Sequence, residues 1–281
     1  MSAHAKRIAV VTDSTADIPE SLAADNNITV VPAILIVNGR SYTDGRDLDR
    51  AELYAGMDLM DQLPSTAIPA PLAFSHVYET LLDRGAEHII SIHVSRKLSG
   101  MLNAVHQAAL SFGDRIHPID SGQVSLGLGF QALEIARMAS EGIALDAILE
   151  QIGQLKLKAR TIAGIDSLEY LKRSGRVSWL RAEIGLKLRL RLILEVVDGD
   201  VLRHSIVRTR RQVLAKLTSI AQSWQPLQRL AVLHSGIPFL ADEMAASLGN
   251  LSQHPPFSVD VTTVIGAHVG PRSIGLAGLI E

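Results

Sequence analysis

Short apolar runs alternate with helix-patterned segments through the first half of the chain, and this alternation constrains the fold most. The run Ile89–Ile92 is rich in β-branched residues and bounded by polar ones, which predicts a buried strand. The next segment, Met101–Phe112, repeats apolar residues at helical spacing. Comparable units begin at Ile8–Val11 and Ile116–Ile119. Strands that alternate with helices favour a largely parallel sheet, so we expect an α/β domain here.

The second half carries different signals. Asp198-Gly199 lies between the apolar runs Leu190–Val197 and Val201–Val207, which is typical of a two-residue antiparallel turn. Phe257–Val264 predicts a further strand, and Gly266–Pro271 predicts a glycine-rich turn before the last apolar strand. The second half is therefore expected to hold a mixed sheet.

The expected fold class is α/β, with two α/β domains. Residues 1–157 would form an N-terminal domain with a mainly parallel sheet, and residues 158–281 a C-terminal domain with a mixed sheet. Within the first domain, Asn38-Gly39 predicts a hairpin, and Asp17 is placed to cap a helix from about Pro19.

The charge balance excludes some classes of partner. The chain of 281 residues has 27 basic and 29 acidic side chains, so no overall positive field attracts nucleic acid or an anionic membrane surface. Aromatic residues make up 4% of the chain, too few to suggest base-stacking platforms. The apolar fraction is mostly aliphatic, which is typical of an ordinary core and also suits a pocket for an alkyl chain.

Cysteine is absent, which excludes disulfides, thiolate metal sites and cysteine nucleophiles. No apolar h-region precedes a small-residue cleavage site, and no apolar stretch approaches membrane-spanning length. We therefore expect a cytoplasmic protein with no stable membrane insertion.

A candidate anion site follows the strand Ile89–Ile92. Ser95, Ser99 and Gly100 lie where a strand ends and a helix begins, which brings hydroxyls and free backbone N–H groups to one place. The alternative is that Ser99 only caps the helix. Arg96 and Lys97 leave the choice open, since both side chains can be solvated.

Thr66 and His268 are two further candidates for binding an anion. Thr66 lies in a proline-rich loop, where threonine is usually a turn residue. His268 can donate to a carboxylate, or its ring can be bonded within its own tight turn.

Three arginines suggest contact with an acidic partner. Arg208, Arg210 and Arg211 begin a predicted helix, where cations oppose the helix dipole.

Several catalytic motifs are missing from the sequence. It has no Gly-x-Ser-x-Gly elbow, no His-Glu-x-x-His or other metal-ligand spacing, and no phosphate-binding Gly-x-x-x-x-Gly-Lys loop. Gly127-Leu-Gly129 lacks the third glycine of a dinucleotide fingerprint. No metal or cofactor is expected from these patterns.

Five motifs, in order along the chain, resemble those of the DegV family, whose members include the FakB subunits of bacterial fatty acid kinase. The resemblance covers nearly the whole sequence. The motifs are Val11–Asp17, Ser95-x-x-Leu-Ser-Gly100, Asp120-Ser121 with Ser125-Leu-Gly, Leu168–Ser178 and His268-Val-Gly-Pro271.

The resemblance implies a function. Proteins of this family bind one long-chain fatty acid between two α/β domains and carry out no chemistry themselves. A separate kinase subunit phosphorylates the carboxylate that they present, which yields acyl phosphate for lipid synthesis. By this resemblance a fatty acid would be the ligand here, and the fatty acid kinase catalytic subunit the partner.

The same resemblance assigns residues to roles. Thr66, Ser99 and Gly100 would hold the carboxylate, together with Ser95 and His268. The supporting turns would contain Arg176, Gly270 and Arg272, and the kinase would contact Arg208 and Arg210. Catalytic and metal-binding residues would be absent.

Several positions depart from the family pattern. Ala67 and Ile68 replace the middle pair of the Thr-Ser-Gln-Pro loop, Arg96 stands where a second serine is common, and Arg272 stands where glycine is usual. Arg191-Leu192 stand where Lys-Pro usually opens the strand before Asp198-Gly199. These changes concern the shape of the head-group site, the preferred chain length and the choice of kinase.

Two rival hypotheses come from other classes. One is a serine-dependent acyl hydrolase acting on small lipid esters, with Ser99, His268 and an aspartate such as Asp13. The other is a kinase-like protein acting alone, which the missing nucleotide motif disfavours.

Overall fold

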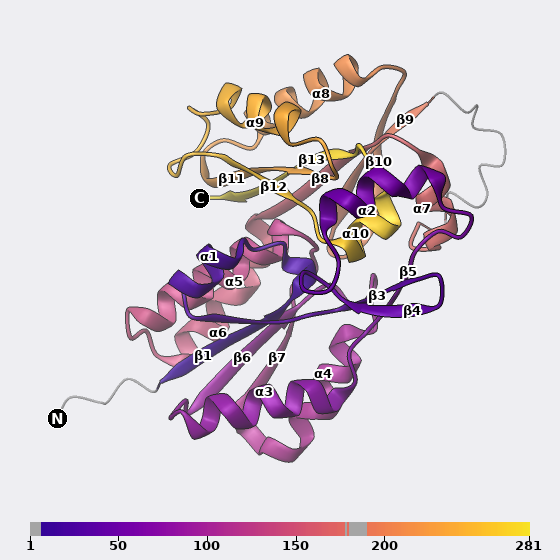
Figure 1. Cartoon of the computed structure of the whole chain (residues 1–281). Coiled ribbons are helices and arrows are strands. Elements are labelled where there is room, and N and C mark those ends of the chain that lie inside the picture. Colours follow the sequence, from indigo (N-terminus) through magenta and orange to yellow (C-terminus); the bar gives the residue numbers. More distant parts are fainter. Residues whose placement is uncertain (1–6, 178, 180–189) are drawn as a thin grey trace.

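The computed structural model describes residues 7–177, 179 and 190–281. Its first sheet has four parallel strands in the order β2-β1-β6-β7, as the alternating pattern predicts (Figure 1). The strands are β1 (Ile8–Asp13), β2 (Ile28–Val31), β6 (His88–His93) and β7 (Ile116–Asp120). Its helices are α1 (Glu20–Asp25), α3 (Pro71–Asp83), α4 (Met101–Ala109), α5 (Leu126–Ser140) and α6 (Leu145–Lys158).

The second sheet has six strands in the order β10-β9-β8-β13-β11-β12. Only the β11–β12 pair is parallel, so the sheet is mixed, as expected. The strands are β8 (Ala159–Ile165), β9 (Arg191–Val197), β10 (Asp200–Val207), β11 (Leu227–His234), β12 (Phe257–Asp260) and β13 (Ile274–Ile280). Its helices are α7 (Leu168–Ser174), α8 (Arg210–Ser223), α9 (Pro238–Ser247) and α10 (Thr263–Val269).

Helix α5 joins the two sheets into one core. It packs on β1 of the first sheet and on β8 and β13 of the second. Two glycines allow the close approach, because a Cβ at Gly127 would run into Thr161 and one at Gly129 would lie 2.6 Å from the carbonyl oxygen of Ala16. The largest apolar cluster accordingly contains residues of both halves of the chain.

A small third sheet, in the order β4-β3-β5, was only partly foreseen. The predicted Asn38-Gly39 hairpin joins β3 (Ile34–Val37) to β4 (Arg40–Thr43). The proline-rich loop, however, contains a short strand, β5 (Ser65–Ala67), in which Thr66 pairs with Leu35. This sheet leads to α2 (Arg50–Gly56), which lies beside α10 of the second half (Figure 1).

Two local expectations are wrong. The strand predicted for Phe257–Val264 ends at Asp260, and Thr263–Val269 form helix α10, so His268 lies on a helix rather than in a glycine-rich turn. Asp17 does not cap α1, whose first turn follows Pro19. Instead, Asp17 ends the 3-10 helix η1 (Ser14–Ala16), with φ 52°. Two further 3-10 turns are η2 (Met57–Leu59) and η3 (Leu110–Arg115).

Two further predictions concern the domain boundary near residue 157 and the fourth motif. Helix α6 ends at Lys158 and β8 follows at once, while the boundary near residue 157 stays a prediction. Residues 1–6 and Ser178, the last residue of the fourth motif, lie outside the described part. Among the helices of residues 7–177, 179 and 190–281, none has the length and apolar character needed to cross a membrane.

Candidate functional site

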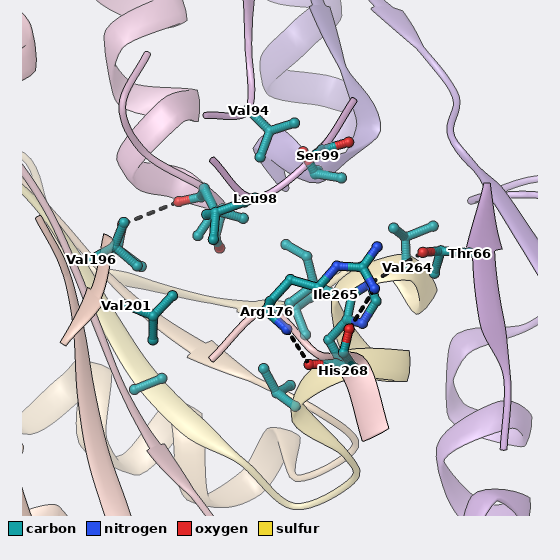
Figure 2. A pocket seen from close by; sticks show the side chains of 18 of the residues that line it. Thr66, Val94, Leu98, Ser99, Arg176, Val196, Val201, Val264, Ile265 and His268 are labelled. Carbon is teal, nitrogen blue, oxygen red and sulfur yellow. Dashed lines mark hydrogen bonds between the residues drawn. The ribbon is translucent and has the colours of Figure 1, made fainter. Parts of the chain in front are cut away.

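A cavity of about 220 Å³ lies between the carboxyl ends of β1 and β6 and the inner face of the six-stranded sheet, with α10 along one side (Figure 2). Carboxyl ends of parallel strands are the usual ligand-binding edge of α/β sheets. The wall is mostly aliphatic and includes Val94, Leu98, Ala163, Ile165, Leu194, Val196, Val201, Leu233, Val264 and Ile265. Such a wall suits an alkyl chain.

Polar side chains gather at one part of this wall. Thr66 of β5 and His268 of α10 are in contact, with 3.1 Å between Oγ1 and Nε2. Ser99 and Gly100, in the loop that leaves β6, line the same cavity. Figure 2 shows Thr66, Ser99 and His268 around one region with Arg176, while Val196 and Val201 lie across from them.

Ser99 can both support the helix and face a ligand. Its Oγ accepts a hydrogen bond from the backbone N–H of Met101, at 3.2 Å, while Gly100 is the N-cap of α4. Accepting that bond uses an oxygen lone pair and leaves the hydroxyl hydrogen to donate into the cavity. Capping and ligand binding are therefore compatible.

Burial keeps His268 neutral. It lowers the pKa of the imidazole from 6.5 to about 4, and the positive charge of Arg176 adds to the effect. A neutral imidazole has one donor and one acceptor nitrogen. If Nε2 donates to Thr66, the threonine hydroxyl is free to donate to a ligand oxygen.

Of two further residues assigned to the site, one of the supporting turns and one of the carboxylate-binding set, only the first reaches the cavity. Arg176 lines the cavity and donates to the backbone oxygen of Ser174 at 2.6 Å. Ser95 does not line it: the side chain is buried against Gly199, and Oγ accepts from the N–H of Lys97.

Gly270 and Arg272 shape the turn after α10 rather than the cavity wall. Gly270 has φ 76°, and a Cβ there would run into the Tyr170 ring. Arg272 also adopts a left-handed conformation, φ 61°, which glycine adopts at no steric cost. Its guanidinium binds Asp58 at 2.5 Å and Asp166 at 3.4 Å, contacts that offset the backbone strain.

The two expected partner-contact arginines lie at the start of α8. Arg210 forms an ion pair with Asp166 at 3.2 Å, and the exposed Arg208 accepts a bond from Arg191 at its backbone oxygen. The helix begins with a capping box between Thr209 and Gln212, a Thr-x-x-Gln signal that the sequence contained and that we missed.

The hydrolase triad is not assembled. Asp13 binds the buried His93, with 2.8 Å between Oδ2 and Nδ1, and also accepts from Thr15 and from the N–H of Val94. His268 contacts Thr66 instead. Within the described part of the chain, no group of three His, Cys, Asp or Glu side chains could hold a metal ion.

The family model described as "Uncharacterised protein, DegV family" matches residues 7–281. The chain belongs to the DegV family. A DegV domain-containing protein of Deinococcus radiodurans is 32% identical to it, over 96% of this chain and 97% of the relative.

Two solved DegV proteins have the same fold. The Thermus thermophilus protein, described as a fatty-acid-binding DegV family protein, has a TM-score of 0.87 with 28% identity and covers 97% of this chain and 99% of its own. DegV of Bacillus subtilis, described as a fatty acid binding protein, has a TM-score of 0.86 with 28% identity and covers 98% and 100%. The two-domain α/β fold is thus the fold of DegV proteins that bind fatty acids.

Acid stability is expected to depend on His268. Between pH 6.5 and about 4 the unfolded DegV chain binds a proton that folded His268 does not, so stability falls as pH drops through this range. His268→Gln should remove this contribution, which amounts to about 3 kcal/mol at pH 4. Urea unfolding of both proteins at several pH values measures it, and equal pH dependence in both would contradict the buried, neutral state of His268.

Proposed function

We propose that this DegV protein binds one long-chain fatty acid in the cavity and presents the carboxylate to a separate kinase subunit. The observation that carries the proposal is the cluster of Thr66, Ser99 and His268 at one part of an otherwise aliphatic cavity. Each methylene that leaves water contributes about 0.8 kcal/mol. The carboxylate, by contrast, must be hydrogen-bonded, because an unpaired buried charge is very costly.

The head-group site supplies donors without a fixed ion pair. The hydroxyls of Ser99 and Thr66 donate to the carboxylate, His268 orients Thr66, and Arg176 adds positive charge nearby. Such a site leaves an oxygen of the carboxylate available to a phosphoryl donor. The protein itself performs no catalysis in this proposal and works in the cytoplasm, with residues 1–157 and 158–281 as its two domains.

Mass spectrometry tests the ligand. Protein purified from cells and then denatured should release a long-chain fatty acid in nearly equimolar amount. After delipidation the protein should bind such an acid saturably. Absence of both results would overturn the proposal.

A reconstituted reaction tests the partner. With a fatty acid kinase catalytic subunit and ATP, the loaded protein should yield acyl phosphate. The exposed Arg208 is proposed to contact the kinase, together with Arg210. Arg208→Ala should slow this reaction while fatty-acid affinity is unchanged, and an unchanged rate would remove Arg208 from the contact.

A further inference from the structure

The backbone that leads into α10 is held by side chains from the first 54 residues of the chain. Arg50 Nη1 donates to the carbonyl oxygen of Asp260 at 2.6 Å. The hydroxyl of Tyr54 lies 2.7 Å from the carbonyl oxygen of Val261 and 3.1 Å from that of Thr262. The single hydroxyl proton of Tyr54 is shared between these two oxygens, and the oxygen of Thr262 also accepts from the N–H of Gly266 at 2.9 Å. Arg50 and Tyr54 thus contact three successive carbonyl groups where β12 ends and α10 begins.

Two buried carboxyl groups hold the N–H groups of the same segment. Thr262 N–H donates to Oδ1 of Asp17 at 2.7 Å. Thr263 donates to Oδ1 of Asp44 through its N–H, at 3.2 Å, and through its hydroxyl, at 2.7 Å. The first N–H groups of a helix have no partner within it and favour nearby acceptors. Here both acceptors come from more than 200 positions away in the sequence.

The contact around Tyr54 is close-packed. A Cβ at Gly236 would lie 2.8 Å from Cβ of Tyr54, and one at Gly266 would run into the Tyr54 ring. Tyr54 itself is 4% exposed. The ring is therefore tightly enclosed between Gly236, in the turn after β11, and Gly266 of α10, and little room exists for α10 to shift against α2.

Helix α10 connects this contact to the head-group site. Thr262 and Thr263 stand at its start and His268 in its last turn, about 9 Å further along at 1.5 Å per residue. Val264 and Ile265 line the cavity between them. Thr66 and Ser99 come from the first half of the chain and His268 from the second, so the position of α10 decides how these three meet.

We propose that Asp17, Asp44, Arg50 and Tyr54 are positioning residues that set α10, and through it His268, against Thr66 and Ser99. None of the four lines the cavity. The inference rests on the proposed fatty-acid function for its binding test, but not for its spectroscopic test. We call these four residues the α10 anchor.

Head-group selectivity tests the α10 anchor. Tyr54→Phe removes the hydroxyl and keeps the ring, and Tyr78→Phe is the matched control, because Tyr78 is a buried tyrosine of α3 whose hydroxyl binds Ser91. We expect Tyr54→Phe to weaken binding of palmitate about fivefold and of hexadecanol less than about twofold. Tyr78→Phe should leave the ratio of the two affinities unchanged. Equal weakening of both ligands by Tyr54→Phe, or no weakening, would overturn the role of the anchor.

Imidazole NMR of the ligand-free protein gives an independent result. His268 should titrate at about 4 in the wild type and closer to its ordinary 6.5 in Tyr54→Phe, because a displaced α10 admits water. Its titration should be unchanged in Tyr78→Phe. A protein that binds no fatty acid but shows this shift would refute the proposed function alone, whereas an unshifted His268 would refute the anchor alone.

Asp44 provides a rescue pair. Asp44→Ala removes the acceptor of both Thr263 bonds, whereas Asp44→Asn keeps an acceptor oxygen in place. Asp44→Ala should therefore reproduce the selective loss of palmitate binding, and Asp44→Asn should remain within about twofold of the wild type. Equal behaviour of the two variants would contradict the positioning role of this carboxyl group.

Discussion

The double variant Thr66→Val, Ser99→Ala is expected to bind a long-chain fatty acid about a hundredfold more weakly than the wild type. Each hydroxyl is proposed to donate to the carboxylate, and hydrogen bonds to charged groups contribute about 1.5–3 kcal/mol each. Losing two of them costs at least about 3 kcal/mol, which corresponds to this change in Kd. Both residues line the cavity, and valine preserves the shape of Thr66. Isothermal titration of delipidated protein with palmitate measures the effect.

Ser140→Ala is the control for this experiment. Ser140 is an exposed serine at the end of α5, and its hydroxyl bonds only its own helix, at the oxygen of Arg137. Its affinity for palmitate should equal that of the wild type. Wild-type affinity in the double variant would show that the carboxylate lies elsewhere in the cavity.

The positions of Ser99 and Gly100 in the head-group site could be predicted from the sequence, whereas the contact between Thr66 and His268 could not. Ser99 and Gly100 follow a clear strand and precede a clear helix, so local pattern is enough to place them. Thr66 is 202 positions from His268, and no local pattern reveals that the two side chains touch. Ser95 lies only four residues before Ser99, yet it points away from the cavity against Gly199.

The sequence at the start of α10 predicts a strand, whereas the structure has a helix there. The run Val259–Ile265 is rich in β-branched residues, which favour strands when only neighbours in sequence are considered. The structure overrides this preference because Asp17 and Asp44 accept the N–H groups at the helix start and Tyr54 fills the space beside Gly266. These are contacts between distant segments.

The parallel and mixed sheets could be predicted, whereas the cavity wall could not. The alternating units predict a parallel sheet, and the Asp-Gly and Asn-Gly turns predict two local hairpins, β9–β10 and β3–β4, which formed as expected. The wall depends on register between distant strands: Ala163 pairs with Leu194 on one side and with Gly275 on the other. The alternation of β8 indicates which residues share a face, but not that a cavity lies over that face.

Ala163→Phe, in this part of the cavity wall, is expected to lower the affinity for a long-chain acid strongly. Ala163 lines the cavity between Leu194 and Gly275, where small side chains leave the space open. A phenyl ring there occupies volume that about four methylenes of a bound chain would fill, at about 0.8 kcal/mol each. Affinity for stearate should therefore fall about a hundredfold. The loss for octanoate should be much smaller, because a short chain needs less of the cavity.

Ala246→Phe separates this effect from a general one. Ala246 is exposed on α9, and the added ring there should leave both affinities unchanged. In the ligand-free protein, Ala163→Phe should raise the melting temperature, because the ring buries apolar surface in existing space, whereas Ala246→Phe should not. A destabilised fold would weaken both acids together. Selective loss of the longer acid from a protein of equal or higher melting temperature is the result that a cavity for an alkyl chain requires, and equal loss of both acids would contradict it.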